Sequence, residues 1–464
     1  MKILVIGNGG REHAIVWKVR QDDPSVELYC APGNAGTAAL ATNLPIKADD
    51  IDGIVAWAIE NKPELVIVGP EVPLCLGLVD ALTEKGIRAF GPCKAAAQME
   101  GSKKFAKDIM LAAGVPTARC AVVHTPEEAR EKIKEFGIPV VLKADGLAAG
   151  KGVSVCMNQA EVEEAIDTMM ITKSFGESAT EVLIEEFMSG EEASILAFVD
   201  GEHIVPLASA QDHKRLLNND KGPNTGGMGS YSPAPCVSED MMTVVQSRIL
   251  EPVVAELRNR GIVYKGILYA GLMLTPTGPR VVEFNCRFGD PETQSILPRM
   301  DFNMVEAMNA CIDGTLCKEM IKWKPGNCVC VVMVAGGYPG KYDKDNPIEG
   351  IAEAEQDEAN LRLVCPCLYG KGRHTGREHT VDEPRPGEEV RAGRPRLGEG
   401  GIFHSAIPTL QKNISFPDFY LCELGGQAKS LTPFAEPLSR CRVSHAVTQK
   451  AEGSEHVGSF GLLY

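Results

Sequence analysis

The 464-residue sequence lacks any uninterrupted apolar run of the roughly 18 residues that a membrane-spanning helix needs. It also lacks an excess of basic charge, because 62 Asp and Glu residues outnumber 47 Lys and Arg residues and leave a net charge of −15. A protein that binds polyanions through its surface should be basic. We therefore expect neither a membrane nor nucleic acid as a partner. The chain enters a strand-like pattern at once, without the cleavage pattern of a secretory leader, and we expect a cytoplasmic protein.

Cysteine pairs with the spacing of metal ligands are also missing. Fifteen cysteines are scattered along the chain, and Cys328-x-Cys330 and Cys365-x-Cys367 are too close together to be CxxC pairs. We interpret the cysteines as reduced, buried thiols. The chain is 44% hydrophobic and 23% charged, which is typical of a globular protein, and its length suggests roughly three or four domains.

Strand-like and helix-like patterns alternate through about residue 358, which predicts an α/β fold. Runs such as Ile3–Ile6, Leu65–Val68 and Arg280–Phe284 are typical of strands. Helical spacing occupies the gaps, as at Arg11–Arg20 and Glu127–Phe136. Breaks in the pattern predict domain boundaries near residues 101, 192 and 326.

The last part of the chain, residues 359–464, has a different composition. It holds 13 Lys and Arg residues against 11 Asp and Glu residues, a charge of +2, whereas residues 1–358 carry −17. The segment Arg373–Arg396 has almost no apolar periodicity, so it cannot bury enough surface to offset the entropy of ordering. We expect poor order over residues 360–400 at least. A shifted reading frame and a basic interaction tail are both compatible with this composition.

The first motif with chemical meaning is Gly7-Asn8-Gly9-Gly10-Arg11-Glu12-His13, between a predicted strand and a predicted helix. Glycines let the backbone approach an anion, and the helix N-terminus supplies unpaired N–H donors. Glu12 stands where a dinucleotide fingerprint has its third glycine, and no acidic residue follows the next strand to bind a ribose. A phosphate site for a smaller ligand, an NAD site and a tight turn without a ligand all remain open. Two further loops, 32–36 and 69–74, should meet it at one sheet edge.

The second motif is the lysine-bearing glycine loop from Lys143 to Gly152. Such a loop can fold over a polyphosphate. It is not a Walker A motif, because Lys151 comes one residue early and Gly152 replaces the Ser or Thr that holds magnesium. An ordinary hairpin loop is the alternative. The acidic segment 185–192 follows another predicted strand, and it could equally be a solvated turn.

The third motif runs from Val281 to Gln294. Residues two apart on a strand point the same way, so Glu283 and Asn285 should present two oxygen ligands suited to magnesium. Arg287 follows and is suited to a carboxylate or a transferring phosphoryl group. Asp290 and Glu292 add acceptors for an amine or a sugar hydroxyl. The alternative is a cluster of salt bridges with a purely structural role.

Between the second and third motifs lies a cationic cluster, Gln211-Asp212-His213-Lys214-Arg215, followed by the glycine-rich segment 222–229. A cationic cluster beside such a segment fits a mobile phosphate clamp. A charged surface loop is the other reading.

These motifs together resemble the ATP-grasp superfamily. Within it, residues 1–358 resemble the phosphoribosylamine–glycine ligase family in order and spacing, and the most specific match is Arg287-Phe288-Gly289-Asp290-Pro291-Glu292. The resemblance implies an N-terminal domain on the phosphoribosylamine side over residues 1–101, a linker over 102–120, and a small ATP-grasp subdomain over 121–192. It implies a larger ATP-grasp subdomain with the metal site over 193–326 and the start of a C-terminal domain over 327–358. Residues 359–464 do not resemble the family.

The resemblance implies a ligase that forms a C–N bond in purine synthesis. ATP would drive the joining of glycine to 5-phosphoribosylamine through glycyl phosphate, with Mg²⁺ or Mn²⁺, in a monomer or weak homodimer. Lys143, Asp212 and Arg287 are the implied catalytic residues, and Glu283 and Asn285 the metal ligands. The implied ATP-binding residues are Lys103, Lys143, Lys151, Glu185, Glu186, Phe187, Met188, Glu192, Arg215 and Asn224. The implied contacts of phosphoribosylamine are Gly9, Gly10, Gly69, Pro70, Glu71, Asp290 and Glu292.

Other functions remain compatible with the residues. One is a different ATP-grasp ligase that joins a carboxylate to an amine. Another is an NAD-dependent oxidoreductase, which Glu12 disfavours. The third is an inactive nucleotide-binding protein, because an aberrant end of the chain would expose apolar surface and lower solubility and activity.

Overall fold

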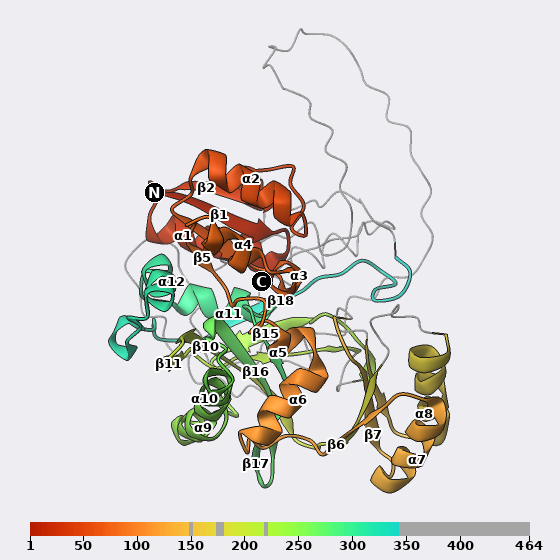
Figure 1. The fold of residues 1–464 in the computed structure, drawn as a ribbon. Coiled ribbons are helices and arrows are strands. Elements are labelled where there is room, and N and C mark those ends of the chain that lie inside the picture. Colours follow the sequence, from red (N-terminus) through yellow and green to blue (C-terminus); the bar gives the residue numbers. More distant parts are fainter. Residues whose placement is uncertain (148–151, 173–180, 218–220, 343–464) are drawn as a thin grey trace, which may run out of the picture.

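The computed structural model describes residues 1–147, 152–172, 181–217 and 221–342. Expectations for Lys151 and for residues 359–464 therefore lie outside the described residues. In the described part, no helix is both long and apolar enough to cross a membrane. Figure 1 shows an N-terminal sheet at the top, a central sheet below it and a smaller sheet with two helices beside the central one.

The N-terminal domain is a parallel sheet with the strand order β3-β2-β1-β4-β5. Its strands are β1 (Lys2–Gly7), β2 (Glu27–Pro32), β3 (Thr42–Asn43), β4 (Leu65–Val68) and β5 (Ala89–Phe90). Its helices are α1 (Gly10–Asp22), α2 (Ile51–Asn61), α3 (Glu71–Leu76) and α4 (Leu78–Glu84), with a 3₁₀ turn at Thr37–Ala39. Both faces of β1 are buried, which is why its sequence is apolar without alternation.

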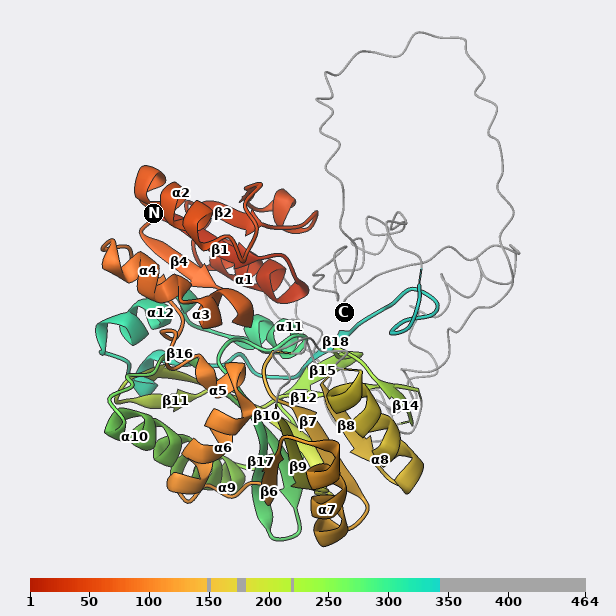
Figure 2. The same cartoon turned by 45° about the vertical axis from the view of Figure 1, so that its right-hand side comes forward.

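Two short helices, α5 (Gln98–Gly101) and α6 (Lys103–Ala112), lead from this domain to the lid subdomain, residues 120–186. Its antiparallel sheet has the order β6-β9-β7-β8. The strands are β6 (Cys120–Val123), β7 (Val140–Ala144), β8 (Val153–Cys156) and β9 (Val182–Glu186). Helices α7 (Pro126–Phe136) and α8 (Gln159–Ile166), which continues as a π-helical turn at Asp167–Ile171, cover one face of this sheet (Figure 2).

The large subdomain is built on an antiparallel sheet with the order β11-β10-β16-β17. Its strands are β10 (Glu191–Asp200), β11 (Ile204–Pro206), β16 (Lys265–Thr275) and β17 (Gly278–Asn285). Its helices are α9 (Glu239–Val245), a π-helical turn at Gln246–Leu250, α10 (Glu251–Asn259), α11 (Glu292–Ile296) and α12 (Met304–Asp313), with 3₁₀ turns at Leu297–Arg299 and Lys318–Met320.

Two small sheets complete the large subdomain. β12 (Gln211–Asp212), β15 (Gly229–Ser232) and β18 (Cys328–Val331) form one, and β13 (Arg215–Leu217) pairs with β14 (Lys221–Asn224) in the other. β18 lies in the segment predicted to open a C-terminal domain, yet it pairs with β15 of the large subdomain. The predicted boundary near residue 326 stays a prediction.

The cores explain how these parts are joined. There are two large buried clusters. Leu4 and Ile6 of β1 belong to one of them together with Ile195 of β10, and Ile3 and Val5 of β1 belong to the other together with other residues of β10. Alternate side chains of β1 therefore lead into two apolar layers that continue from the N-terminal domain into the large subdomain. The lid subdomain has a third cluster, and within the part of the chain that the structure describes all of its members belong to that subdomain.

The α/β fold class predicted from the alternating pattern is confirmed. The strands expected at Ile3–Ile6, Leu65–Val68 and Arg280–Phe284 are β1, β4 and part of β17. The expected helix Arg11–Arg20 lies inside α1, and the expected helix Glu127–Phe136 matches α7 to within one residue. β1 and β4 are recognisable as short, continuous apolar runs because both faces of these strands are buried, and the helices are recognisable by their period of 3.6.

Candidate active site

The glycine loops predicted to meet at one sheet edge do so. The turn with Gly9 and Gly10 follows β1, and the turn with Gly69, Pro70 and Glu71 follows β4, the neighbouring parallel strand. The strand order reverses between β1 and β4, which makes this crevice the switch point where open α/β sheets bind ligands.

The carboxylate of Glu12 fills the cradle that these glycines form. It accepts a hydrogen bond from the Gly9 N–H at 2.6 Å and pairs with the Arg11 guanidinium. A Cβ on Gly7, whose φ is +125°, would lie 2.5 Å from the Glu12 side chain, and a Cβ on Gly69 would collide with the same carboxylate. The chain's own anion thus occupies the space next to the loop backbone. Glu12 therefore stands where the dinucleotide fingerprint requires its third glycine, and this loop departs from that fingerprint.

Arg287 joins the N-terminal domain to the large subdomain. Its guanidinium lies 2.9 Å from Glu100 and 3.5 Å from Glu71, and it donates to Asn285 Oδ1 at 3.2 Å. Burial acts to lower the pKa of Arg287, but Glu100 and Glu71 outweigh burial and raise it. Burial also acts to raise the pKa of Glu71, and Arg287 with Arg11 outweighs it in the opposite direction. This cation is therefore permanently charged and held by acids from two preceding elements.

Glu283 and Asn285 lie two residues apart on β17, opposite Gly271 and Tyr269 of β16, while Phe284 between them belongs to the core. In the described part of the chain, no Lys or Arg nitrogen lies within ion-pair distance of Glu283. Four cations nevertheless act on it: burial raises the pKa of Glu283, but the charges of Lys214, Lys143, Lys103 and Arg287 together lower it. A carboxylate surrounded by cations that do not touch it leaves room for anionic groups between them.

Lys143 belongs to a buried ion-pair triad, which we call the Glu185 triad: Lys107, Lys143 and Glu185. The Glu185 carboxylate lies 2.8 Å from Lys143 Nζ and 2.8 Å from Lys107 Nζ, and its side chain is 4% exposed. Lys143 Nζ also donates to the Val282 carbonyl at 2.9 Å, next to Glu283. Burial acts to raise the pKa of Glu185, but the two lysines outweigh it and lower it. The triad therefore ties α6, the lid sheet and β17 together.

Lys103 lies at the start of α6, where the lysine-bearing glycine loop docks. Its Nζ donates to the Gly146 carbonyl at 2.8 Å, and Asp145 Oδ1 accepts from the backbone N–H groups of Lys103 at 2.7 Å and Lys104 at 3.2 Å. A carboxylate at a helix N-terminus is favourably placed for the helix dipole. Burial lowers the pKa of Lys103, and Glu283 opposes that change.

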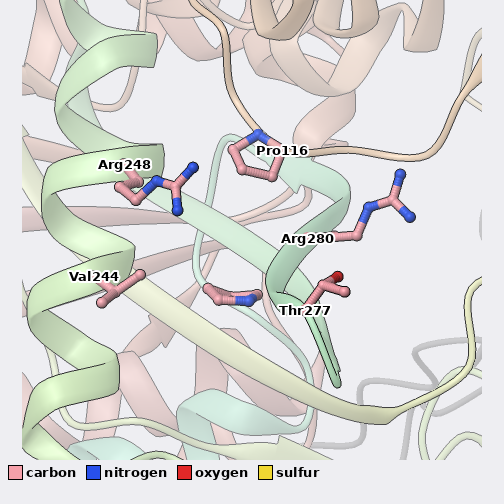
Figure 3. Close-up of a pocket in the computed structure, with 6 residues that line it drawn as sticks. Pro116, Val244, Arg248, Thr277 and Arg280 are labelled. Carbon is pink, nitrogen blue, oxygen red and sulfur yellow. The ribbon is translucent and has the colours of Figure 1, made fainter.

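The segment predicted to contact adenine, Glu185 to Met188, has its two acidic side chains already engaged. Glu186 accepts from the Arg119 N–H at 2.9 Å and pairs with Arg280, while Phe187 is 38% exposed and Met188 is buried. In this segment, the backbone groups and the apolar side chains are therefore the groups that remain for a contact with adenine. Arg280 also lines a pocket of about 170 Å³, in which its guanidinium turns away from Arg248 (Figure 3). That pocket is lined by Pro116, Val244, Arg248, Thr277, Pro279 and Arg280, none of them a predicted site residue.

Asp212 is the centre of an acidic group, which we call the Asp212 cluster: Asp212, Lys214, Glu192 and Glu292. Lys214 Nζ lies 3.0 Å from Glu192 and 3.8 Å from Asp212, whose side chain is 5% exposed. Glu292 is buried and accepts hydrogen bonds from the hydroxyls of Ser194, at 3.1 Å, and Tyr269. Burial raises the pKa of Asp212 to about 7; Lys214 opposes this, and Glu292 and Glu192 add to it.

The remaining predicted residues lie on either side of this cluster. Arg215 and Asn224 face each other in the β13–β14 hairpin, where Arg215 donates to the Gly222 carbonyl at 2.8 Å. Asp290 accepts from Gln294 at 2.6 Å and from the Arg11 N–H at 3.4 Å, and a Cβ on Gly9 would lie 3.2 Å from it. Asp290 therefore borders the β1 loop. Lys151 lies outside the described residues.

Two family descriptions match the chain. Phosphoribosylglycinamide synthetase, N domain, matches residues 1–100, and Phosphoribosylglycinamide synthetase, ATP-grasp (A) domain, matches residues 101–293. The chain belongs to the phosphoribosylglycinamide synthetase family. The family predicted from the motifs is thereby confirmed.

Individual members of the phosphoribosylglycinamide synthetase family give the degree of similarity. The phosphoribosylamine–glycine ligase of Rhodopirellula baltica is 49% identical over 363 residues, 77% of this chain and 83% of that protein. The enzyme of that name from Vibrio vulnificus strain YJ016 is 50% identical over 359 residues, 76% of this chain and 83% of that protein. The crystal structure of phosphoribosylamine–glycine ligase from Thermotoga maritima superposes with a TM-score of 0.64 at 36% identity, covering 75% of this chain and 83% of that one.

A more distant structure shares the fold alone. The biotin carboxylase domain of the Hydrogenobacter thermophilus 2-oxoglutarate carboxylase has a TM-score of 0.58 at 19% identity, covering 75% of this chain and 79% of that one.

The site of this phosphoribosylglycinamide synthetase family member also contains residues that no sequence motif indicates. Lys107, Glu100 and Tyr269 lie outside every motif, yet they hold Glu185, Arg287 and Glu292. One indication was available for Lys107: it lies four residues after Lys103, and it faces inward on a helix with apolar neighbours. Glu100 and Tyr269 gave no local indication, because their partners lie far along the chain.

Proposed function

We propose that this chain joins glycine to 5-phosphoribosylamine at the expense of ATP, giving glycinamide ribonucleotide, ADP and phosphate in purine synthesis. Family membership supports the reaction, and relatives about 50% identical carry the name phosphoribosylamine–glycine ligase. The single structural observation that carries the proposal is the set of four cations around Glu283 from four separate segments, none of them in direct ion-pair contact with it. Such a charge arrangement suits a triphosphate tail.

The chemistry requires activation of a carboxylate, which is a poor electrophile at neutral pH. An oxygen of the glycine carboxylate attacks the γ-phosphorus of ATP, and the bond to ADP breaks, which gives glycyl phosphate. The amine of phosphoribosylamine then attacks the acyl carbon, phosphate leaves and the amine loses a proton. Little covalent work falls to the protein, so positioning and neutralisation of charge dominate catalysis. The lysines, Arg287 and the buried acids of the site are suited to this positioning and to the neutralisation of charge.

The donor set on β17 fits a hard divalent cation. Glu283 supplies a carboxylate and Asn285 an amide oxygen, and Mg²⁺ commonly takes only one or two such protein ligands beside phosphates and water. Asn285 Oδ1 accepts one hydrogen bond from Arg287 and keeps a second lone pair. We propose that these two residues hold Mg²⁺ or Mn²⁺. The bound ion supplies neutralisation of phosphate charge.

The other predicted roles are part of the same proposal, with refinements that the contacts support. Glu185 and Glu186 serve adenine through backbone groups, because their carboxylates bind lysines and arginine. Glu292 serves as a buried support, since Ser194 and Tyr269 already donate to it. Lys103, Lys143 and Lys151, with Arg215 and Asn224, contact phosphates, Glu192 contacts the ribose, and Arg287 contacts the acyl phosphate. Gly9, Gly10, Gly69, Pro70, Glu71 and Asp290 form the phosphoribosylamine side.

The test is ADP release by the full chain, measured with ATP, glycine and freshly made phosphoribosylamine, each omitted in turn. We expect release to require glycine, and Glu283→Ala to reduce it by at least about 10²-fold, because a group that holds transition-state charge is lost. Glu202→Ala, an exposed acid outside the site, is the matched control and should keep full activity.

Two results would contradict the proposal. One is release that needs neither co-substrate or survives Glu283→Ala. The other is release driven by formate or bicarbonate in place of glycine, which would indicate a different ATP-grasp ligase. We further propose a cytoplasmic monomer or weak homodimer without a nucleic-acid partner, in keeping with small-molecule substrates and an acidic chain.

A further inference from the structure

Lys107 has a buried ammonium group whose hydrogen-bonding capacity is fully used inside the protein. Its side chain is 5% exposed, and its Nζ lies 2.8 Å from Glu185 Oε1. The same nitrogen donates to Thr117 Oγ1 at 2.8 Å and to the Ala118 carbonyl at 3.2 Å. A lysine ammonium has three N–H donors, so these three partners use all of them. Lys107 therefore has no donor left for a ligand, and any effect that it has on a ligand must act through one of these partners.

The Glu185 carboxylate connects Lys107 to Lys143. Its two oxygens are divided between the lysines, because Oε1 lies 2.8 Å from Lys107 Nζ and Oε2 lies 2.8 Å from Lys143 Nζ. The three side chains of the Glu185 triad are 4% or 5% exposed, so the solvent screens these contacts little. Since each oxygen has its own lysine, the position of the Lys107 ammonium determines how the carboxylate is oriented toward Lys143.

The ammonium of Lys143 differs from that of Lys107 in its number of partners. Two acceptors hold it, Glu185 Oε2 at 2.8 Å on β9 and the Val282 carbonyl at 2.9 Å on β17. In the part of the chain that the structure describes, its third N–H has no acceptor. Val282 directly precedes Glu283, the proposed metal ligand. The remaining donor of Lys143 therefore lies next to the place where the proposed reaction needs the phosphates of ATP.

Thr117 fixes Lys107 to the metal strand by a second route. Its hydroxyl accepts from Lys107 Nζ and donates to the Val281 carbonyl at 2.8 Å, and its backbone pairs with Val281 in an isolated β-bridge. Lys107 is thus held against Val281 through Thr117, and Lys143 is held against Val282 directly. β17 is therefore the common frame to which both lysines of the Glu185 triad are attached.

We propose that Lys107 is a positioning residue in the proposed reaction: it orients the Glu185 carboxylate so that Lys143 directs its remaining N–H at a phosphate of ATP. The inference rests on the proposed ligase function, which places Lys143 on the nucleotide. Lys107 itself does not touch a substrate. Without its ammonium, Oε1 of Glu185 loses its cation, the carboxylate can turn, and it competes with the phosphate for the donors of Lys143.

The test measures two quantities in the full chain, the dissociation constant of a non-hydrolysable ATP analogue with Mg²⁺ by calorimetry, and KM for glycine from ADP release. Lys107→Met keeps the length of the side chain and removes the ammonium. We expect it to weaken binding of the analogue at least about tenfold and to leave KM for glycine within about twofold. Lys132→Met is the matched control, because Lys132 lies in the lid in an exposed ion pair with Glu135, and it should bind the analogue as the unmodified chain does.

A double-mutant cycle separates positioning from a general effect. If Lys107 acts through Lys143, then Lys107→Met should weaken the analogue by less than about threefold when Lys143→Met is already present. The loss of one positive charge, or a general weakening of the lid, would instead cost the same factor in both backgrounds and would overturn the inference.

Thr117→Val is a milder variant that decides the question if Lys107→Met does not fold. It removes only the hydroxyl that accepts from Lys107 and donates to the Val281 carbonyl. Because one hydrogen bond to Lys107 is lost, we expect about threefold weaker binding of the analogue, and no further loss when Lys143→Met is present. Equal losses with and without Lys143→Met would contradict the inference here as well.

The outcomes separate this inference from the proposed function. If the unmodified chain binds the analogue and releases ADP only with glycine, while Lys107→Met binds the analogue equally well, Lys107 is not a positioning residue and the ligase function stands. If the unmodified chain does not bind the analogue, both the inference and the proposed function are wrong.

Discussion

Two buried carboxylates, Glu185 at the lid junction and Asp212 in the large subdomain, differ in how completely the protein neutralises them. Their side chains are 4% and 5% exposed. Glu185 has two lysines at 2.8 Å and a lowered pKa, whereas Asp212 has one lysine at 3.8 Å and a pKa raised to about 7. Equal burial therefore produces opposite electrostatic results. A carboxylate that the fold neutralises stabilises the folded chain, whereas one that it leaves short of positive charge lowers stability when it ionises.

Glu185→Gln should have the largest effect of the changes that probe this contrast. The substitution leaves Lys107 and Lys143 buried without a carboxylate, which typically costs about 3–5 kcal/mol of unfolding free energy. Denaturant unfolding of the purified chain measures this. A loss below about 1 kcal/mol would show that the triad is solvated and that the contrast with Asp212 is false.

The pH dependence of this penalty has a defined sign. The pKa of Glu185 is lowered from its ordinary value of 4.5, so its contribution to stability is present above pH 4.5 and disappears as pH falls through the folded-state pKa. The difference in stability between Glu185→Gln and the unmodified chain should therefore shrink in acid.

Asp212→Asn should change stability in the opposite direction. The pKa of Asp212 is raised from 3.8 to about 7, so the folded chain holds a proton that the unfolded chain has lost, and its ionisation lowers stability as pH rises from about 4 to 7. Without glycine, the substituted chain should gain roughly 2–3 kcal/mol over the unmodified chain between pH 5 and pH 8, since one pKa unit corresponds to about 1.4 kcal/mol. Thermal unfolding at the two pH values measures the gain. A substitution that destabilises equally at both would contradict the comparison.

Tyr269→Phe tests the support behind Asp212 with a smaller effect. It removes the hydroxyl that donates to the buried Glu292 and leaves Ser194 as the other donor. A carboxylate that loses one of two donors should cost about 1–2 kcal/mol of unfolding free energy, with little change in KM for ATP. Ser194→Ala is the matched variant on the other donor and should cost a similar amount. An effect on ATP larger than on glycine would place Glu292 on the nucleotide side instead.

Asp313→Asn gives the smallest expected effect and sets the scale for exposed pairs. Asp313 and Arg88 lie 2.8 Å apart, but their side chains are 48% and 40% exposed. Solvent screens such a pair, so the loss should be at most about 1 kcal/mol and should decrease further in high salt. A loss of unfolding free energy as large as that of Glu185→Gln would mean that burial does not determine how much an ion pair contributes to stability.

The sequence was sufficient for the elements and for the groups of residues that adjoin a motif. Gly9, Gly69 and Glu71 could be placed together because parallel strands present their turns at one edge, and Glu283 and Asn285 because a strand has a period of two. The family followed from motif order. Each of these inferences used spacing along a single segment or a rule of sheet topology.

The pairings that set the charges of the site could not be predicted. Arg287 binds Glu100, which precedes it by more than 180 residues, and Glu185 binds Lys107 across two subdomains. In the sequence pattern Glu12 only marks the absence of the fingerprint's third glycine, whereas in the structure its carboxylate lies against Gly7, Gly9 and Gly69. Local patterns contain no information on which distant acid approaches which base, and that choice determines whether a charge is satisfied or left open.

The lid subdomain should unfold locally more easily than the rest of the described structure, because it has a hydrophobic core of its own. Its buried side chains, such as Val140, Val162 and Ile184, belong to a cluster whose members among the described residues all come from the lid subdomain, while the other two clusters each span two domains. Backbone amides of β7 and β9 should consequently exchange with deuterium in a cooperative step of lower free energy than amides of β1 and β10. Bound nucleotide, by bridging the lid to the large subdomain, should bring the two exchange rates closer together.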